Sequence, residues 1–171
     1  MKALDLCCGM GGWTEGLLAA GWEVIGVDTE IHPEYPAPAL KADVRTLSGD
    51  WFAGIALVVA SPPCEEFSRH GMPWTRAKNP PAPDLSIVEA CYRIAREVGA
   101  PLVLENVRSA QPWLGKAVWN WGSCYLWGDG VPVLRLKVPP GNGKERLSSA
   151  ARMRRAKIPV DLARYVAEYH Q

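Results

Sequence analysis

A cysteine follows two prolines in the segment Pro62-Pro63-Cys64, and its thiol is the side chain of this sequence best suited to nucleophilic chemistry. The apolar, partly β-branched run 55–60 comes just before it and predicts a buried strand. Prolines cannot extend a sheet, so we expect them to stiffen a loop at the strand's end, where open α/β sheets bind ligands. An isolated cysteine is more often a small buried residue. The polar run 65–69 instead indicates a thiol displayed to a substrate.

A glycine-rich turn over residues 9–12 separates a predicted strand, 3–6, from a predicted helix, about 13–20. A second strand, 23–27, ends at Asp28 and completes a βαβ unit. Such a turn lets the main chain approach a nucleotide-like cofactor, and Asp28 could accept hydrogen bonds from ribose hydroxyls. The same turn could equally serve packing, because it lacks a clean Gly-x-Gly-x-x-Gly pattern.

A carboxylate, Glu105, follows the predicted strand 102–104. One interpretation is an ordinary strand-end acid that caps the next turn. The functional interpretation is that a neighbouring strand holds the Glu105 carboxyl group near Cys64. A carboxyl group in a partly dry pocket has a raised pKa and can carry a proton near neutral pH.

The remaining elements complete an alternating pattern of strands and helices, which predicts one α/β domain over residues 1–171 with a mostly parallel sheet covered on both faces. We expect a proline-rich loop at 31–40, a mobile loop over the site at 69–84, a helix at about 85–98, strands at 124–127 and 133–138, and a final helix at about 160–169.

Composition restricts the possible functions. A formal net charge of +1 argues against a protein that binds long duplex DNA without a partner, because affinity for duplex DNA depends on neutralising its phosphates. Basic residues cluster within 144–157, as a solvated face or a phosphate-binding patch.

The five cysteines form no Cys-x-x-Cys pair, so neither a disulfide framework nor a metal site is indicated. With no signal peptide or membrane span, we expect a reduced, cytoplasmic protein. The eight tryptophans predict packing, with base stacking as the alternative.

Taken together, these segments resemble the cytosine carbon-5 methyltransferases, which use S-adenosylmethionine. Residues 5–12 are similar to the family's Asp-Leu-Phe-Ala-Gly-x-Gly-Gly cofactor loop, and residues 62–68 to its Pro-Pro-Cys-Gln-x-Phe-Ser motif. Residues 105–107 match its Glu-Asn-Val motif. Asp28 ends the second strand as the family's acidic residue does, and Asp43 stands where the family places an acid near the adenine.

The resemblance implies a Rossmann-like, S-adenosylmethionine-dependent methyltransferase fold and a covalent mechanism. Cys64 would add to carbon 6 of cytosine, Glu105 would bond to ring nitrogen 3 and the exocyclic amine, and Arg135 would orient the base or a phosphate. An outward-facing strand arginine remains an equal interpretation of Arg135. The residues implied to bind the cofactor are Asp5, Cys7, Gly9, Gly11, Gly12, Trp13, Asp28, Thr29, Asp43, Val44 and Pro62.

The sequence departs from the family in several places. Glu65 replaces the motif's glutamine, and the later motifs, around 130–137, 146–149 and 158–163, are degenerate. Ala156-Lys157 replaces the usual Gly-Asn. Only residues 138–144 stand where the family carries a target-recognition domain, too few to read a major-groove sequence.

We therefore expect a minimal enzyme that methylates cytosine in duplex or single-stranded DNA. A partner chain or a homodimer could supply target recognition. The alternatives are the same chemistry on RNA or on a free cytosine nucleotide, and a non-catalytic subunit that regulates a partner. A fourth, an amino methyltransferase, is disfavoured because such enzymes carry an aromatic residue where Cys64 follows the proline pair.

Overall fold

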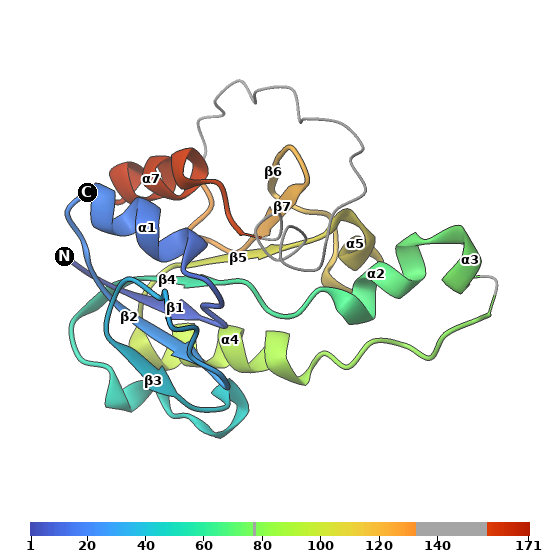
Figure 1. The fold of residues 1–171 in the computed structure, drawn as a ribbon, viewed down its shortest axis with the longest axis horizontal. Coiled ribbons are helices and arrows are strands. Elements are labelled where there is room, and N and C mark those ends of the chain that lie inside the picture. The colour runs from blue at the N-terminus through green and yellow to red at the C-terminus, as the bar shows by residue number, and fades with distance from the viewer. Residues whose placement is uncertain (77, 133–156) are drawn as a thin grey trace.

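A computed structural model of the chain describes residues 1–76, 78–132 and 157–171. Its centre is a seven-stranded sheet in the order β3-β2-β1-β4-β5-β7-β6 (Figure 1). The first five strands in that order are parallel, and β7 is antiparallel to both of its neighbours. The strands are β1 (Lys2–Leu6), β2 (Glu23–Asp28), β3 (Ala39–Lys41), β4 (Ile55–Ala60), β5 (Leu102–Asn106), β6 (Trp119–Trp121) and β7 (Cys124–Trp127).

Helices cover both faces of the sheet. Helices α1 (Gly12–Ala19) and α7 (Val160–Tyr169) lie on one face, and α4 (Ser86–Val98) lies on the other (Figure 1). Successive side chains of a strand point to opposite faces, so each central strand supplies both cores. In β4, Leu57 belongs to the α1–α7 core and Val58 to the α4 core. This arrangement confirms the predicted Rossmann-like α/β fold.

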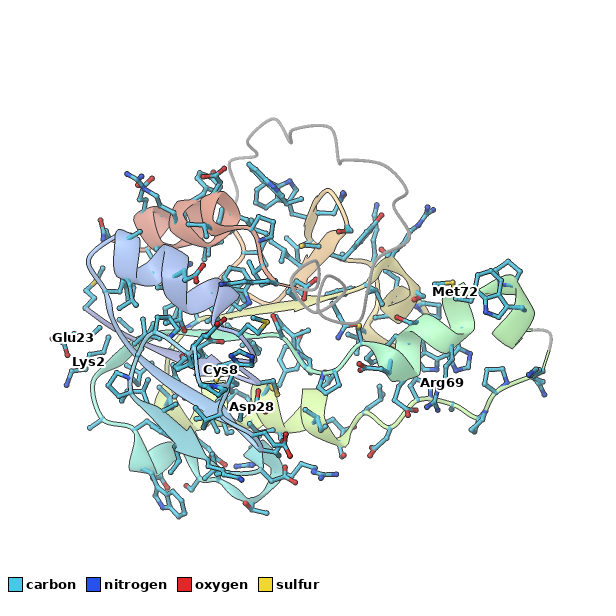
Figure 2. All side chains as sticks on the ribbon, in the orientation of Figure 1. Lys2, Cys8, Glu23, Asp28, Arg69 and Met72 are labelled. Atoms are coloured by element: carbon cyan, nitrogen blue, oxygen red, sulfur yellow. The ribbon has the colours of Figure 1, made fainter. Side chains whose placement is uncertain are left out.

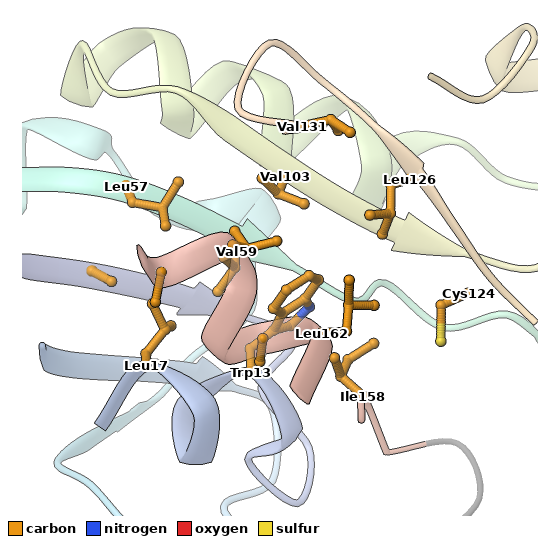
Figure 3. Close-up of a cluster of buried hydrophobic side chains, with 14 of the residues drawn as sticks. Trp13, Leu17, Leu57, Val59, Val103, Cys124, Leu126, Val131, Ile158 and Leu162 are labelled. Carbon is orange, nitrogen blue, oxygen red and sulfur yellow. The ribbon is translucent and has the colours of Figure 1, made fainter. Parts of the chain in front are cut away.

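The last helix packs closely against the first. A side-chain carbon on Gly16 of α1 would collide with Ala163 of α7, so glycine permits the two backbones to approach. Leu162 of the same helix is fully buried with Leu17 and Trp13 (Figure 3). This contact brings the C-terminal part of the chain back to the glycine turn that precedes α1.

The predicted helix at 85–98 is confirmed as α4, and the predicted helix at 160–169 as α7. The expectation of an irregular loop at 69–84 is wrong for its first part, which forms α2 (Glu65–Gly71) and α3 (Pro73–Arg76). Helix α2 has no apolar period because one residue, Phe67, anchors it. Acidic residues in its first turn and basic residues in its last turn complement the helix dipole.

Two strands were not predicted. Strand β3 begins within the segment predicted as a proline-rich loop, so that prediction is wrong for residues 39 and 40, where the short strand lies at the sheet edge. Strand β6 pairs with β7, with Trp119 opposite Leu126 and Trp121 opposite Cys124. Trp119, Trp121 and Trp127 are all buried, which confirms packing as their role. The predicted strand at 133–138 lies outside the described residues, as does the basic cluster up to 156.

The remaining short elements are η1 (Val44–Thr46), η2 (Gly49–Trp51), η3 (Arg108–Ala110) and α5 (Gln111–Leu114). Across the described part of the chain, every helix is too short or too polar to traverse a bilayer.

Candidate active site

The register of the parallel strands aligns four side chains at one edge of the sheet. Leu6 pairs with both Val27 and Ala60, and Ala60 pairs with Leu104. The residues that come next along the chain therefore meet at the carboxyl edge, where open α/β sheets bind ligands. Those four residues are Cys7, Asp28, Ser61 and Glu105.

A cavity of about 340 Å³ opens at this edge, a size within the usual range for small-molecule sites. Cys64 and Glu105, which the sequence predicted to be catalytic, both line it. Most of the predicted cofactor-binding residues line it as well, namely Cys7, Gly9, Gly12, Trp13, Asp28, Thr29, Asp43, Val44 and Pro62. Figure 2 shows Asp28, the last residue of β2, beside Cys8, another lining residue that follows β1.

Cys64 stands immediately before α2 and is partly buried. Burial raises the pKa of its thiol, and the negative charges of Glu65 and Glu105 raise it further. A hydrogen bond with Ser68 acts in the opposite direction. The resting side chain is consequently a thiol at neutral pH, and its action as a nucleophile requires loss of a proton.

Glu105 is a candidate proton donor. Burial raises the pKa of its carboxyl group to about 7, although hydrogen bonds with Cys124 and Ser61 favour the anion. The strand parity explains the burial, because Glu105 points to the same face of β5 as Val103, which lies in the α1–α7 core. A carboxyl group with this pKa can give or take a proton near pH 7.

Hydrogen bonds hold the cysteine loop against the neighbouring strands. The Nδ2 of buried Asn106 donates to the main-chain oxygen of Pro62 at 3.0 Å, and the Oδ1 accepts from the nitrogen of Val107 at 2.9 Å. On the other side, the indole Nε1 of Trp13 donates to Ser61 Oγ at 3.0 Å. Both ends of Ser61-Pro62 are thereby fixed, which positions the loop that carries Cys64.

The glycines of the turn have different roles. Gly9 has a φ of +49°, and a side-chain carbon there would meet no atom within 4 Å. Its nitrogen donates to Asp28 Oδ2 at 2.9 Å. Gly11, in contrast, makes room for the rings of Tyr35 and Pro36. Gly11 is therefore explained by packing, and it is not among the described lining residues of the cavity.

Asp43 is already paired within the protein. Its carboxylate accepts from Arg45 at 2.6 Å in a salt bridge, and Arg45 lowers the pKa of Asp43. Both residues line the cavity beside Val44. The carboxylate thus stays ionised, with its orientation fixed by the guanidinium.

Asp5 lies behind the cavity and is fully buried. Its Oδ2 accepts from the hydroxyl of Thr14 at 2.6 Å, and its Oδ1 has no hydrogen-bond partner among the described residues. Burial raises the pKa of Asp5 to about 7. Asp5 therefore joins β1 to the first turn of α1 through Thr14.

The C-terminal segment completes the cavity, which the sequence did not predict. Lys157 and Ile158 line it, and a side-chain carbon on Gly12 would lie 2.5 Å from the nitrogen of Ile158. Lys157 Nζ donates to Glu15 Oε1 at 2.5 Å. The only signal in the sequence is that Lys157 occupies the position of the family's Gly-Asn motif. Arg135 lies outside the described residues.

No protein-family model and no curated protein matches this chain. Solved structures do resemble it. A DNA modification methyltransferase of an E. coli prophage, described as putative, is 22% identical over 64% of this chain and 33% of its own length, with a TM-score of 0.47. Dnmt2 of S. pombe is 19% identical over 65% of this chain and 36% of its own, with a TM-score of 0.44.

A glycopeptide N-methyltransferase, MtfA, solved with S-adenosyl-L-methionine, is 19% identical over 61% of this chain and 46% of its own, with a TM-score of 0.39. The chain thus spans a third to a half of these proteins. Likeness at this level does not by itself assign an activity.

Proposed function

We propose that this protein is an S-adenosylmethionine-dependent methyltransferase that methylates carbon 5 of cytosine in DNA through a covalent adduct with Cys64. One observation carries the proposal. Cys64 and Glu105 line the same cavity as Gly9 and Asp28, at the carboxyl edge of the sheet. A nucleophile and an acid thereby share one space with residues suited to a nucleoside cofactor.

The lining residues fit the cofactor. Asp28 would accept hydrogen bonds from ribose hydroxyls, with Thr29 beside it, and the open space at Gly9 would admit a ligand close to the main chain. Asp43 and Val44 would contact the adenine. Trp13 and Pro62 complete the wall. The bound cofactor supplies an electrophilic methyl group on its sulfonium.

Residues of the protein would then activate the cytosine base. The Cys64 thiolate attacks carbon 6 of cytosine, and the electrons move to carbon 5 and the ring nitrogen. Glu105 gives its proton to ring nitrogen 3, which stabilises the adduct and makes carbon 5 nucleophilic. After methylation, carbon 5 loses its proton to solvent, Cys64 leaves as thiolate, and ring nitrogen 3 returns its proton to Glu105. Arg135 would orient the base or a phosphate.

Transfer of labelled methyl groups tests the proposal. We expect label at carbon 5 of cytosine in DNA with the native chain and none with Cys64→Ala, while binding of the cofactor is retained. Cys91→Ala is the control for loss of a cysteine outside the described lining of the cavity; because the Cys91 thiol contacts Cys7 of the lining, cofactor binding is measured for this variant as well. Label transfer by Cys64→Ala at the native rate would refute the nucleophile.

A covalent trap separates the other functions. DNA that contains 5-fluorocytosine should lock onto the native chain, because the fluorine cannot leave as a proton does. Neither a regulatory subunit nor an amino methyltransferase would be trapped. Parallel assays with RNA and with free cytosine nucleotides identify the substrate if DNA is not labelled.

A further inference from the structure

A second concave surface, of about 1210 Å³, lies beside the cavity. It runs between α2, the segment that follows β5, and the turn from β6 to β7. We call it the flanking groove. Its lining residues are Ser68, His70, Gly71, Met72, Val107, Arg108, Ser109, Gln111, Pro112, Trp113, Lys116, Gly122, Ser123 and Tyr125.

The flanking groove adjoins the candidate catalytic residues. Ser68, in its wall, donates its main-chain N–H to the main-chain oxygen of Cys64 at 2.8 Å. Tyr125, also in its lining, pairs across β7 and β5 with Asn106, which directly follows Glu105. A polymer whose target base reaches Cys64 and Glu105 therefore has this surface next to it.

The flanking groove and the cavity differ in the charges of their lining residues. Arg108 and Lys116 line the flanking groove, both exposed, together with His70. No aspartate or glutamate is present among its described lining residues, whereas carboxylates such as Asp28 and Asp43 line the cavity. A groove with cations and no carboxylates is complementary to a phosphodiester.

Aromatic rings supply surfaces on which a base can stack. Trp113 is partly buried, and its ring centroid lies 4.4 Å from that of His70 and 6.1 Å from that of Phe67. Tyr125 is partly buried on the other wall. Met72 adds apolar surface, 44% exposed, on the opposite side of the α2–α3 arm from Arg69 (Figure 2). Rings held by neighbours lose little freedom when a base stacks on them.

We infer that the flanking groove binds the nucleotides next to the target cytosine in a single-stranded polynucleotide, an inference that rests on the proposed function. Aromatic surfaces beside cations characterise single-strand grooves. Binding of a duplex would need many phosphate contacts. The described groove offers two side chains that stay positively charged, Arg108 and Lys116, and the net charge of the chain is only +1. An unpaired cytosine also reaches Cys64 without the free-energy cost of flipping.

Binding measurements without cofactor test this inference separately from catalysis. Fluorescence anisotropy would follow a short labelled oligonucleotide as single-stranded DNA, as single-stranded RNA and as a duplex, over a range of salt concentrations. The test variant is Arg108→Ala with Lys116→Ala. The matched control is Lys2→Ala with Arg96→Ala, which removes the same charges from exposed sites at the amino edge of the sheet.

We expect the native chain to bind single strands more tightly than the duplex. Loss of two phosphate contacts should reduce the slope of log affinity against log salt by about 1.4 in the test variant, with no change in the control. Trp113→Leu should weaken binding by about fivefold or more at constant salt slope, because it removes a stacking surface. The preferred strand, DNA or RNA, identifies the source of the polymer.

Equal binding by native chain and test variant would overturn the inference, even if methyl transfer to DNA is observed. Preference for the duplex would also overturn it. Conversely, if single strands bind through the groove but no methyl group is transferred, the binding role of the groove is supported and the proposed reaction is contradicted.

Discussion

The side chain of Asn106 donates a hydrogen bond to the main-chain oxygen of Pro62 at 3.0 Å, across two neighbouring strand ends. Asn106 directly follows Glu105, and Pro62 lies two residues before Cys64. One buried amide therefore fixes the separation between the candidate acid and the candidate nucleophile. Reacting groups need such fixed positions, because small displacements reduce rates strongly.

Asn106→Ala should uncouple the two strand ends. The buried oxygen of Pro62 would lose its partner, which should reduce the free energy of unfolding by about 1–3 kcal/mol. Methyl transfer should fall at temperatures where the variant is still folded. Thermal unfolding and initial rates would be measured together. Asn120→Ala, at an exposed position in β6, should change neither. A fully active Asn106→Ala would show that the bond does not position Cys64.

Glu65→Gln should make Cys64 more reactive. Glu65 is the second cause, after burial, of the raised pKa of the Cys64 thiol, and glutamine carries no charge. The variant should therefore show a lower thiol pKa and faster alkylation at neutral pH. Mass spectrometry of the peptide that contains Cys64 would give the rate against pH. Glu66→Gln is the control, since Glu66 is paired with Arg69 at 3.3 Å; an equal effect there would contradict a role specific to Glu65.

The rate of methyl transfer should rise with pH and level off near pH 7. It rises because Cys64 loses its proton, and it levels off because each further gain in thiolate is matched by loss of the Glu105 proton, whose pKa is about 7. Glu105→Gln should be much slower, and its residual rate should continue to rise above pH 7. The measurement is kcat/KM against pH. If the profile of the native protein has no bend near pH 7, Glu105 is not the proton donor of the reaction.

The stability of the fold should fall as the pH rises from about 4 to 7. Burial raises the pKa of Asp5 to about 7, so in this window the folded chain keeps a proton that the unfolded chain releases. The contribution has an upper value of about 4 kcal/mol, since one pKa unit corresponds to about 1.4 kcal/mol. Asp5→Asn should reduce the dependence of Tm on pH without abolishing it, because the raised pKa of Glu105, also about 7, contributes in the same window. Asp161→Asn, an exposed position on α7, should leave it unchanged.

Periodic and strongly apolar segments could be predicted from the sequence, because local burial dictates them. The strand before Cys64 and helices α4 and α7 belong to this group. Cys64 and Glu105 were predicted to meet because the carboxyl ends of parallel strands share one edge. Short elements such as α2 escaped prediction, since a single anchor, Phe67, leaves no period to detect.

The parts of the site that could not be predicted depend on long-range packing. Lys157 reaches the cavity only because α7 docks on α1 through Gly16 and Ala163, a contact that no local pattern encodes. The same holds for Gly11, whose neighbour Tyr35 comes from the proline-rich loop.

The closure of the cavity by Lys157 and Ile158 has a consequence for synthesis of the protein. The sheet strands, β1 to β7, leave the ribosome before these two residues do. A nascent chain can therefore build its sheet while the wall of the cavity over Gly12 is still missing. Tight retention of a ligand would therefore begin only once Lys157 and Ile158 have been translated and α7 has docked on α1.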